Sequence, residues 1–227
     1  MAIQIAHFDA ATAYTSHEGT ILAQRVTPEG LETPFWHQYG HLTRNRAMAG
    51  HAHETDEIYI VMEGSGYVML GGEVRPVRAG DVVAVPHGVW HTMICTDKDC
   101  EPFLWAALWW DAIPGSVKTD GIDVLRFDRE TAHLAHIDTI LASDIVPASI
   151  KAPFDHAYGY LHDGGEMELH NHPKHEFYIV FEGTGTVTVD DETAPVRPGD
   201  VINIPPNAMH TMSGKKGEPF LWAAFWW

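Results

Sequence analysis

The stretch PVRAGDVVAVPHGVWHTM, residues 76–93, returns as PVRPGDVINIPPNAMHTM at residues 195–212, with ten of the eighteen positions identical. A second repeated stretch precedes each copy: HAHETDE at residues 51–57 corresponds to HNHPKHE at residues 170–176. Both pairs share one offset of 119 residues. This period is too long for a solenoid, whose repeats run about 20 to 50 residues, and indicates two complete domains in tandem.

Each repeat carries three histidines and one glutamate at the same spacing. The two sets are His51, His53, Glu57 and His91, and His170, His172, Glu176 and His210. Residues two apart on an extended chain face the same side, so the first two histidines of a set can reach one point. Three imidazoles and one carboxylate favour Fe²⁺ or Mn²⁺ and also suit Ni²⁺, Co²⁺ or Zn²⁺. The sequence therefore predicts divalent-metal sites with open positions, up to two per chain.

The composition is typical of a compact chain with a hydrophobic core, and the net charge limits the classes of binding partner. The chain has 227 residues, 45% hydrophobic and 20% charged, with a formal charge of −17. This acidity disfavours nucleic acid and anionic membranes as partners, and we expect a small-molecule substrate. A signal peptide and a membrane span are not evident, so we expect a cytoplasmic protein. The two cysteines, Cys95 and Cys100, share one polar loop and are interpreted as reduced thiols rather than a bridge or metal ligands.

Short β-branched and aromatic runs bounded by glycine or proline predict strands in both halves. These runs cover residues 58–62, 66–70, 82–85 and 103–110, and then 177–181, 185–189, 201–204 and 220–227. Strands at this spacing favour a sandwich or barrel in each half. We expect an N-terminal barrel over 1–112, a connector with the first strands of the second half over 113–150, and the second barrel's motifs over 151–227. Residues 128–141 are the best helix candidate.

The motif pattern resembles that of a two-domain member of the cupin superfamily. The first cupin motif is matched by Gly164-x5-His170-x-His172-x3-Glu176-x6-Gly183, and most of the second by Gly199-x5-Pro205 with His210. The first half has Asn45 where the opening glycine is expected, and Asn207 replaces a glycine in the second. The resemblance implies an all-β fold of two tandem double-stranded β-helix (jelly-roll) barrels. A homodimer is the default assembly.

Strand parity suggests catalytic candidates. Counting by two from the glutamates places Tyr59 and Tyr178 on the metal-facing side, as hydrogen-bond donors or general bases. Packed barrel tyrosines are an equal alternative. Counting back from His170 gives Glu168, a candidate acid or base or an exposed rim carboxylate, so the two sites are not expected to be equivalent.

Other recurring or clustered residues have structural interpretations. Counting by two from His51 skips Arg44 and Arg46, so on a regular strand their side chains would point away from the metal. This weakens the hypothesis of an oxalate-type decarboxylase, which would need a cation to hold its substrate. Arg78 and Arg197 recur before a Gly-Asp turn and suggest structural ion pairs. The aromatic runs 103–110 and 220–227 predict interdomain or dimer packing. Seven of the ten histidines outside the two sets are interpreted as surface or core residues: His7, His17, His87, His133, His136, His162 and His175.

Three function classes fit these observations. The favoured one is a metal-dependent dioxygenase or oxidoreductase acting on a small oxygen-bearing molecule. The second is a redox-neutral lyase, isomerase or hydrolase in which an in-barrel tyrosine moves a proton, as in the tyrosine-bearing cupin lyases and isomerases that the pattern resembles. The third is a metal or small-ligand binding module without catalysis.

Overall fold

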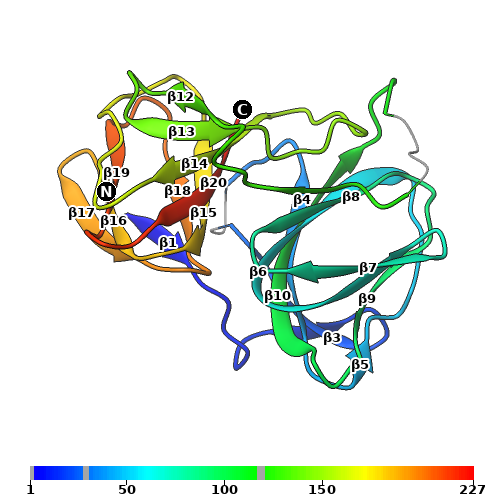
Figure 1. Ribbon diagram of the computed structural model, residues 1–227. Coiled ribbons are helices and arrows are strands. Elements are labelled where there is room, and N and C mark those ends of the chain that lie inside the picture. The colour runs from blue at the N-terminus through cyan, green and yellow to red at the C-terminus, as the bar shows by residue number, and fades with distance from the viewer. Residues whose placement is uncertain (1–2, 28–30, 117–120) are drawn as a thin grey trace.

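The computed structural model describes residues 3–27, 31–116 and 121–227, which form strands and turns (Figure 1). The first half contains β1 (Gln4–Ala6), β2 (Tyr14–Ser16), β3 (Ile21–Gln24), β4 (Trp36–Leu42), β5 (Arg46–Ala47), β6 (Thr55–Leu70), β7 (Glu73–Arg78), β8 (Asp81–Val85), β9 (His91–Cys95) and β10 (Glu101–Asp111). The second half contains β11 (Val124–Arg126), β12 (His133–Ala135), β13 (Ile140–Ser143), β14 (Asp155–Leu161), β15 (Glu176–Glu182), β16 (Gly185–Val189), β17 (Glu192–Val196), β18 (Val201–Ile204), β19 (His210–Gly214) and β20 (Phe220–Trp226). None of the described residues forms a helix long and apolar enough to cross a membrane.

The two halves repeat one sheet order. The main sheet of the first half runs β11-β8-β6-β10-β4-β3-β2, and that of the second runs β1-β18-β15-β20-β14-β13-β12. In the second half β16, β17 and β19 form a separate sheet, whereas in the first half the long strand β6 also pairs with β7 and β9. Each half is therefore an antiparallel double sheet that curls into a barrel, which confirms the predicted all-β fold of two tandem jelly-roll barrels.

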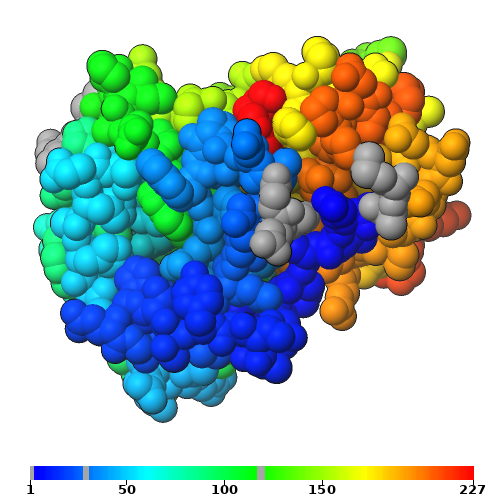
Figure 2. All heavy atoms as spheres, turned by 180° about the vertical axis from the view of Figure 1, so that it is seen from behind, coloured from blue at the N-terminus to red at the C-terminus, as the bar shows by residue number. Residues whose placement is uncertain are grey.

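The halves exchange their first strands. β1 opens the chain but pairs with β18, Ile5 opposite Ile202, whereas β11 opens the second half but pairs with β8, Val124 opposite Val83. Figure 2 shows the blue N-terminal segment leaving the first half and lying against the orange strands of the second. This reciprocal exchange ties the two barrels together through backbone hydrogen bonds.

Apolar side chains fill three clusters, one inside each barrel and one between the barrels. The shared cluster packs the outer faces of β6, β10, β15 and β20 against each other, with Trp110, Phe177 and Phe225 almost fully buried. The inner faces of the same strands fill the two barrels. A strand buried on both faces explains why the aromatic runs are apolar throughout, and the predicted interdomain packing is confirmed.

Two sequence expectations are wrong. Residues 128–141 form no helix, because β12 and β13 make a hairpin whose second strand pairs with β14 and buries Ile140 and Ala142 on alternate positions. The cysteines are not free thiols: Cys95 and Cys100 form a disulfide. The β9–β10 hairpin brings their Cα atoms to 5.4 Å, which lies within the range that a disulfide spans.

Candidate metal centres

Each ligand set is assembled from three neighbouring segments of one barrel. The first two histidines lie on the chain leading into β6 or β15, the glutamate lies on that strand, and the last histidine begins β9 or β19. Backbone hydrogen bonds in both directions join His51 to His91 and His170 to His210. The sheet pairing therefore fixes which imidazoles meet.

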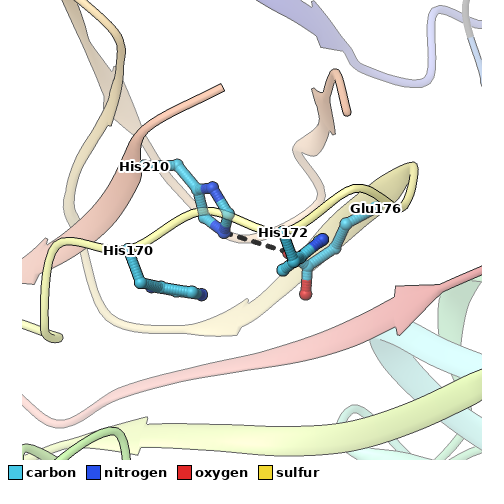
Figure 3. Close-up of side chains that lie close together, drawn as sticks. All are labelled: His170, His172, Glu176 and His210. Carbon is cyan, nitrogen blue, oxygen red and sulfur yellow. Dashed lines mark hydrogen bonds and ion pairs between the residues drawn. The ribbon is translucent and has the colours of Figure 1, made fainter. Parts of the chain in front are cut away.

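In the C-terminal barrel all four predicted side chains converge (Figure 3). One nitrogen or oxygen from each of His170, His172, Glu176 and His210 lies within 4.8 Å of all the others. Glu176 Oε2 is 3.0 Å from His172 Nε2 and 3.1 Å from His210 Nε2. A single cation could contact all four.

The N-terminal set is similar but looser. One nitrogen from each of His51, His53 and His91 lies within 4.8 Å of the other two, but the Glu57 carboxylate is not within that distance of all three. The Glu57 carboxylate still lies 3.0 Å from His53 Nε2 and 3.5 Å from His91 Nε2. Both sets thus come together as the sequence predicts, and the second is the more compact.

The imidazoles are oriented for cation binding by the backbone. His91 Nδ1 donates to the Val89 carbonyl at 2.8 Å, and His210 Nδ1 donates to the Ala208 carbonyl at 2.9 Å. His51 and His170 are held in the same way by the carbonyls two residues before them. Such bonds fix the tautomer and turn the Nε2 lone pair toward the centre. Nε2 of His91 and of His210 is buried and faces the glutamate carboxylate of its own set, at 3.5 and 3.1 Å, so these donor sets fit a divalent cation.

Left-handed turns support the ligands, and asparagine takes the place of glycine in two of them. The N–H of Gly88 donates to the His53 carbonyl, and that of Asn207 donates to the His172 carbonyl, with φ of 70° and 63°. Asn45 has φ of 60°, close to the 75° of its counterpart Gly164. Asparagine tolerates this conformation better than most residues, so the departures from the motif preserve the turns.

Burial and neighbouring charges shift the pKa values of the C-terminal ligands in different directions. Burial raises the pKa of Glu176, but hydrogen bonds and charges from His172 and His210 outweigh it and hold the pKa below its ordinary value. The hydrogen bond to Glu176 raises the pKa of His172 above its ordinary value, against the effect of burial. Burial lowers the pKa of His170. The carboxylate is thus kept ionised, as cation binding requires.

The two tyrosines point into the barrels, as parity predicts, and are almost fully buried. Tyr178 Oη donates to Glu176 Oε2 at 3.2 Å and lines the C-terminal cavity. Burial, followed by the nearby Glu57 or Glu176 carboxylate, raises the pKa of Tyr59 and of Tyr178 well above its ordinary value. Each phenol is therefore a hydrogen-bond donor in this environment and not a ready base.

The parity argument for Glu168 is wrong. Residues 167–169 are not a regular strand, so alternation by two fails there. Met167 is buried and lines the cavity, whereas Glu168 is half-buried outside the lining and contributes its backbone carbonyl to His170. The first barrel buries Met48 at the equivalent position. Glu168 thus fits better the rim carboxylate that the sequence also allowed.

A cavity opens from each ligand set, and the two cavities differ. That of the N-terminal barrel is about 430 Å³ and is bordered by Trp36, Gln38 and Trp109. That of the C-terminal barrel is about 350 Å³ and reaches inward past Ala157 to Tyr178 and Trp222. Ala157 stands where the first barrel has Gln38, and its smaller side chain leaves room for the cavity to reach Tyr178 and Trp222.

Sequence reasoning missed three cavity-lining histidines: His133, which is exposed and lines the C-terminal cavity, and the equivalent pair His17 and His136. His17 lines the N-terminal cavity and His136 lines the C-terminal one, with ring centroids 4.6 Å from His51 and 4.3 Å from His170. Burial, with the neighbouring histidines, lowers the pKa of each to about 4. The signal was present, because these residues are also 119 apart, within a repeat that extends upstream of the ligand motifs. Their assignment to ordinary surface or core positions is wrong.

Of the two interpretations of the arginines, the one for Arg44 and Arg46 agrees with the structure and the one for Arg78 and Arg197 needs correction. Arg44 and Arg46 are exposed, in agreement with their parity. Asp81 and Asp200 accept the backbone N–H of Arg78 and Arg197, but their side-chain partners are Arg126 and His7 from the exchanged strands. The repeated turn therefore anchors the strand exchange and not a pair with its own arginine.

Comparison with known proteins supports the architecture. Residues 36–109 and 158–226 match the cupin domain family. A salicylate 1,2-dioxygenase from Pseudoaminobacter salicylatoxidans, solved in complex with gentisate, superposes with a TM-score of 0.74 at 14% identity, over 99% of this chain and 82% of that one. This likeness is one of fold.

Two curated relatives match a shorter part of the chain. A dimethylsulfoniopropionate lyase, DddW, from Ruegeria pomeroyi is 38% identical over 58 residues, and an uncharacterized protein from Methanocaldococcus jannaschii is 42% identical over 57 residues. Each match spans 25% of this chain, and they cover 38% and 46% of the relatives' lengths.

Proposed function

Since the chain belongs to the cupin domain family and gathers a three-histidine, one-glutamate set in each barrel, we propose that it is a divalent-metal-dependent enzyme acting on a small oxygen-bearing organic molecule. The observation that carries the proposal is the convergence of His170, His172, Glu176 and His210 on one point, with the buried His210 Nε2 facing the Glu176 carboxylate. Iron or manganese suits this donor set best, and nickel, cobalt or zinc could also be held.

The first proposed reaction is an oxygenation. Three nitrogens and one carboxylate oxygen leave two positions on an octahedral ion. When bound, the ion would supply Lewis-acid polarisation of a substrate oxygen and, as iron or manganese, reactivity toward dioxygen. The cavity walls would exclude water, and Tyr178 would keep the Glu176 carboxylate in place by donating its hydroxyl hydrogen.

The C-terminal site is proposed as the main reaction centre. Its four donors are closer together than those of the first barrel, and its cavity extends deeper past Trp222. In the N-terminal site, Trp36 and Gln38 stand at the cavity and would admit a differently shaped molecule.

The proposed oxygenation is tested by oxygen consumption. Iron-loaded and manganese-loaded protein would be supplied with enols, β-diketones and phenols in an oxygen electrode, with an anaerobic parallel and with His170→Ala as the control. Turnover that requires both dioxygen and the His170 ligand supports the proposal. Turnover that continues unchanged without dioxygen refutes this reaction class and directs attention to the next one.

A redox-neutral lyase or isomerase is the second candidate. The observation that favours it is the buried Tyr178 hydroxyl, which lies 3.2 Å from Glu176 and faces the cavity, where it could deliver a proton. The local similarity to a sulfoniopropionate lyase supports the same class. Tyr178→Phe and Tyr59→Phe are the test: anaerobic turnover that disappears while the metal content stays normal would favour a lyase or isomerase, and unchanged turnover would exclude the tyrosines as proton carriers.

A further inference from the structure

A fifth histidine accompanies each ligand set. His17 and His136 lie in equivalent turns directly after β2 and β12, and their rings tilt against those of His51 and His170 at interplanar angles of 61° and 56°. Neither His17 nor His136 contributes a nitrogen to the groups of donor atoms that lie within 4.8 Å of one another. The fifth histidine is thus beside the proposed metal and outside its ligand set.

The ring of His136 is available to a ligand. No hydrogen bond holds it within the described part of the chain, whereas the ring of His17 is 3.1 Å from the Ser16 hydroxyl. His136 is half-buried and lines the cavity, so its ring is neither sealed in a core nor free on an open surface. A polar group at a cavity wall without a protein partner is a candidate for contact with a bound molecule.

The turns that hold these rings are unusual in the same way. Residues 17–19 and residues 136–138 each have three consecutive positive φ values, between 50° and 79° in the first turn and between 51° and 62° in the second. The second turn contains Ile137, a β-branched residue for which this conformation is uncommon and whose side chain is 80% exposed. Such conformations persist where the surrounding structure imposes them, and they cluster at functional sites.

The remaining cavity wall narrows the class of ligand. Apolar and aromatic side chains make up most of it, among them Ile140, Met167, Trp222 and Trp226, and neither cavity is lined by a lysine or arginine among the described residues. A substrate carboxylate would therefore find no cationic side chain there. A hydroxyl or carbonyl oxygen could be hydrogen-bonded by the unpartnered imidazole.

We propose that His136 is a substrate-contacting residue whose imidazole hydrogen-bonds one oxygen of a small, uncharged molecule, while a second oxygen faces the ligand set and the apolar body packs against the cavity wall. This inference rests on the proposed metal-dependent function, because the second oxygen is directed to the ion.

The test measures binding and does not depend on turnover. Acetylacetone, an uncharged diketone, is titrated by calorimetry into Co²⁺-loaded protein that carries His51→Ala, so that only the C-terminal site is complete. His136→Phe keeps the ring packing and removes the hydrogen bond, His136→Gln keeps a hydrogen-bonding group, and His162→Phe is the control because His162 is exposed and outside the cavity. Cobalt content is measured for every variant.

We expect His136→Phe to raise the dissociation constant of acetylacetone roughly five- to tenfold, as the loss of one hydrogen bond would. The His136→Gln and His162→Phe values should stay within about twofold of the parent, with equal cobalt content throughout. An unchanged dissociation constant in His136→Phe, or a loss of cobalt from it, would overturn the contact role. A parent protein that takes up no cobalt would instead contradict the proposed function itself.

Discussion

Replacing Gly159 by alanine should damage the C-terminal barrel through a single close contact. Gly159 lies on β14 opposite Trp222 of β20, and the indole occupies the space that a Cβ on Gly159 would need. A Cβ added there would lie 2.3 Å from two carbons of the Trp222 ring. Carbon atoms pack at about 3.5 Å or more, so the overlap exceeds 1 Å by a rough estimate, and the ring, which is 1% exposed, has room to move only toward the cavity that it lines.

The cost follows from overpacking. Forcing a methyl group into a filled core typically costs about 1–3 kcal/mol. We expect Gly159→Ala to lower the free energy of unfolding by about 2 kcal/mol, which for a chain of this size corresponds to a fall in Tm of roughly 4–8 °C. Because Trp222 lines the cavity, its displacement should also weaken acetylacetone binding while the four ligands still hold metal.

The assay is urea unfolding of Gly159→Ala alone and combined with Trp222→Phe. The smaller ring should relieve the overlap, so the double variant should be less destabilised than the sum of the two single variants. Gly165→Ala is the control, because its added Cβ would meet the movable end of Leu161 at 3.1 Å. Wild-type stability for Gly159→Ala, or strict additivity with Trp222→Phe, would refute the packing argument.

The other predictions concern the strand exchange, a buried histidine and the buried phenol. Arg126→Ala should lower the free energy of unfolding by about 1–2 kcal/mol, because it removes the partner of the buried Asp81 carboxylate; Arg129→Ala, an exposed neighbour, is the control in urea unfolding. Burial lowers the pKa of His37 to about 4 from 6.5, so this residue binds fewer protons in the folded state than in the unfolded state, and its contribution to stability should be complete above pH 6.5 and fall by about 2 kcal/mol toward pH 4.5. His37→Gln should make that pH profile shallower, with a residual slope from the other histidines of lowered pKa, among them His17 and His136, and an identical slope would contradict the assignment. Tyr178→Phe should cost about 1 kcal/mol through the lost hydrogen bond to Glu176 yet leave the metal content unchanged, and loss of metal would show that the phenol supports the ligand set more directly.

Much of the fold and the ligand sets could be predicted from sequence because the chain is duplicated, and the same residues recur at the same spacing in both halves. A single His170 would carry little information, but its pairing with His51, at the offset shared by six other ligands, left few alternatives. Alternation by two worked along β6 and β15, where Tyr59 and Tyr178 lie on regular strands and face inward.

The failures have local physical causes. Alternation failed at Glu168 because the chain there is irregular, and the helix expected over 128–141 gave way to a hairpin stabilised by pairing with β14. The strand exchange could not be predicted, because Ile5 and Val124 suit either barrel equally and only tertiary structure decides between them. The Cys95–Cys100 bridge depends on the hairpin that joins β9 to β10, which composition does not reveal.

Metal content per chain tests the central claim most directly. Freshly purified protein would be measured by element-resolved mass spectrometry beside His51→Ala and His170→Ala. The account predicts about two iron or manganese ions per chain, with one lost in each variant, because each barrel carries its own set of donors. A protein that holds no metal and takes up none on reconstitution would contradict it.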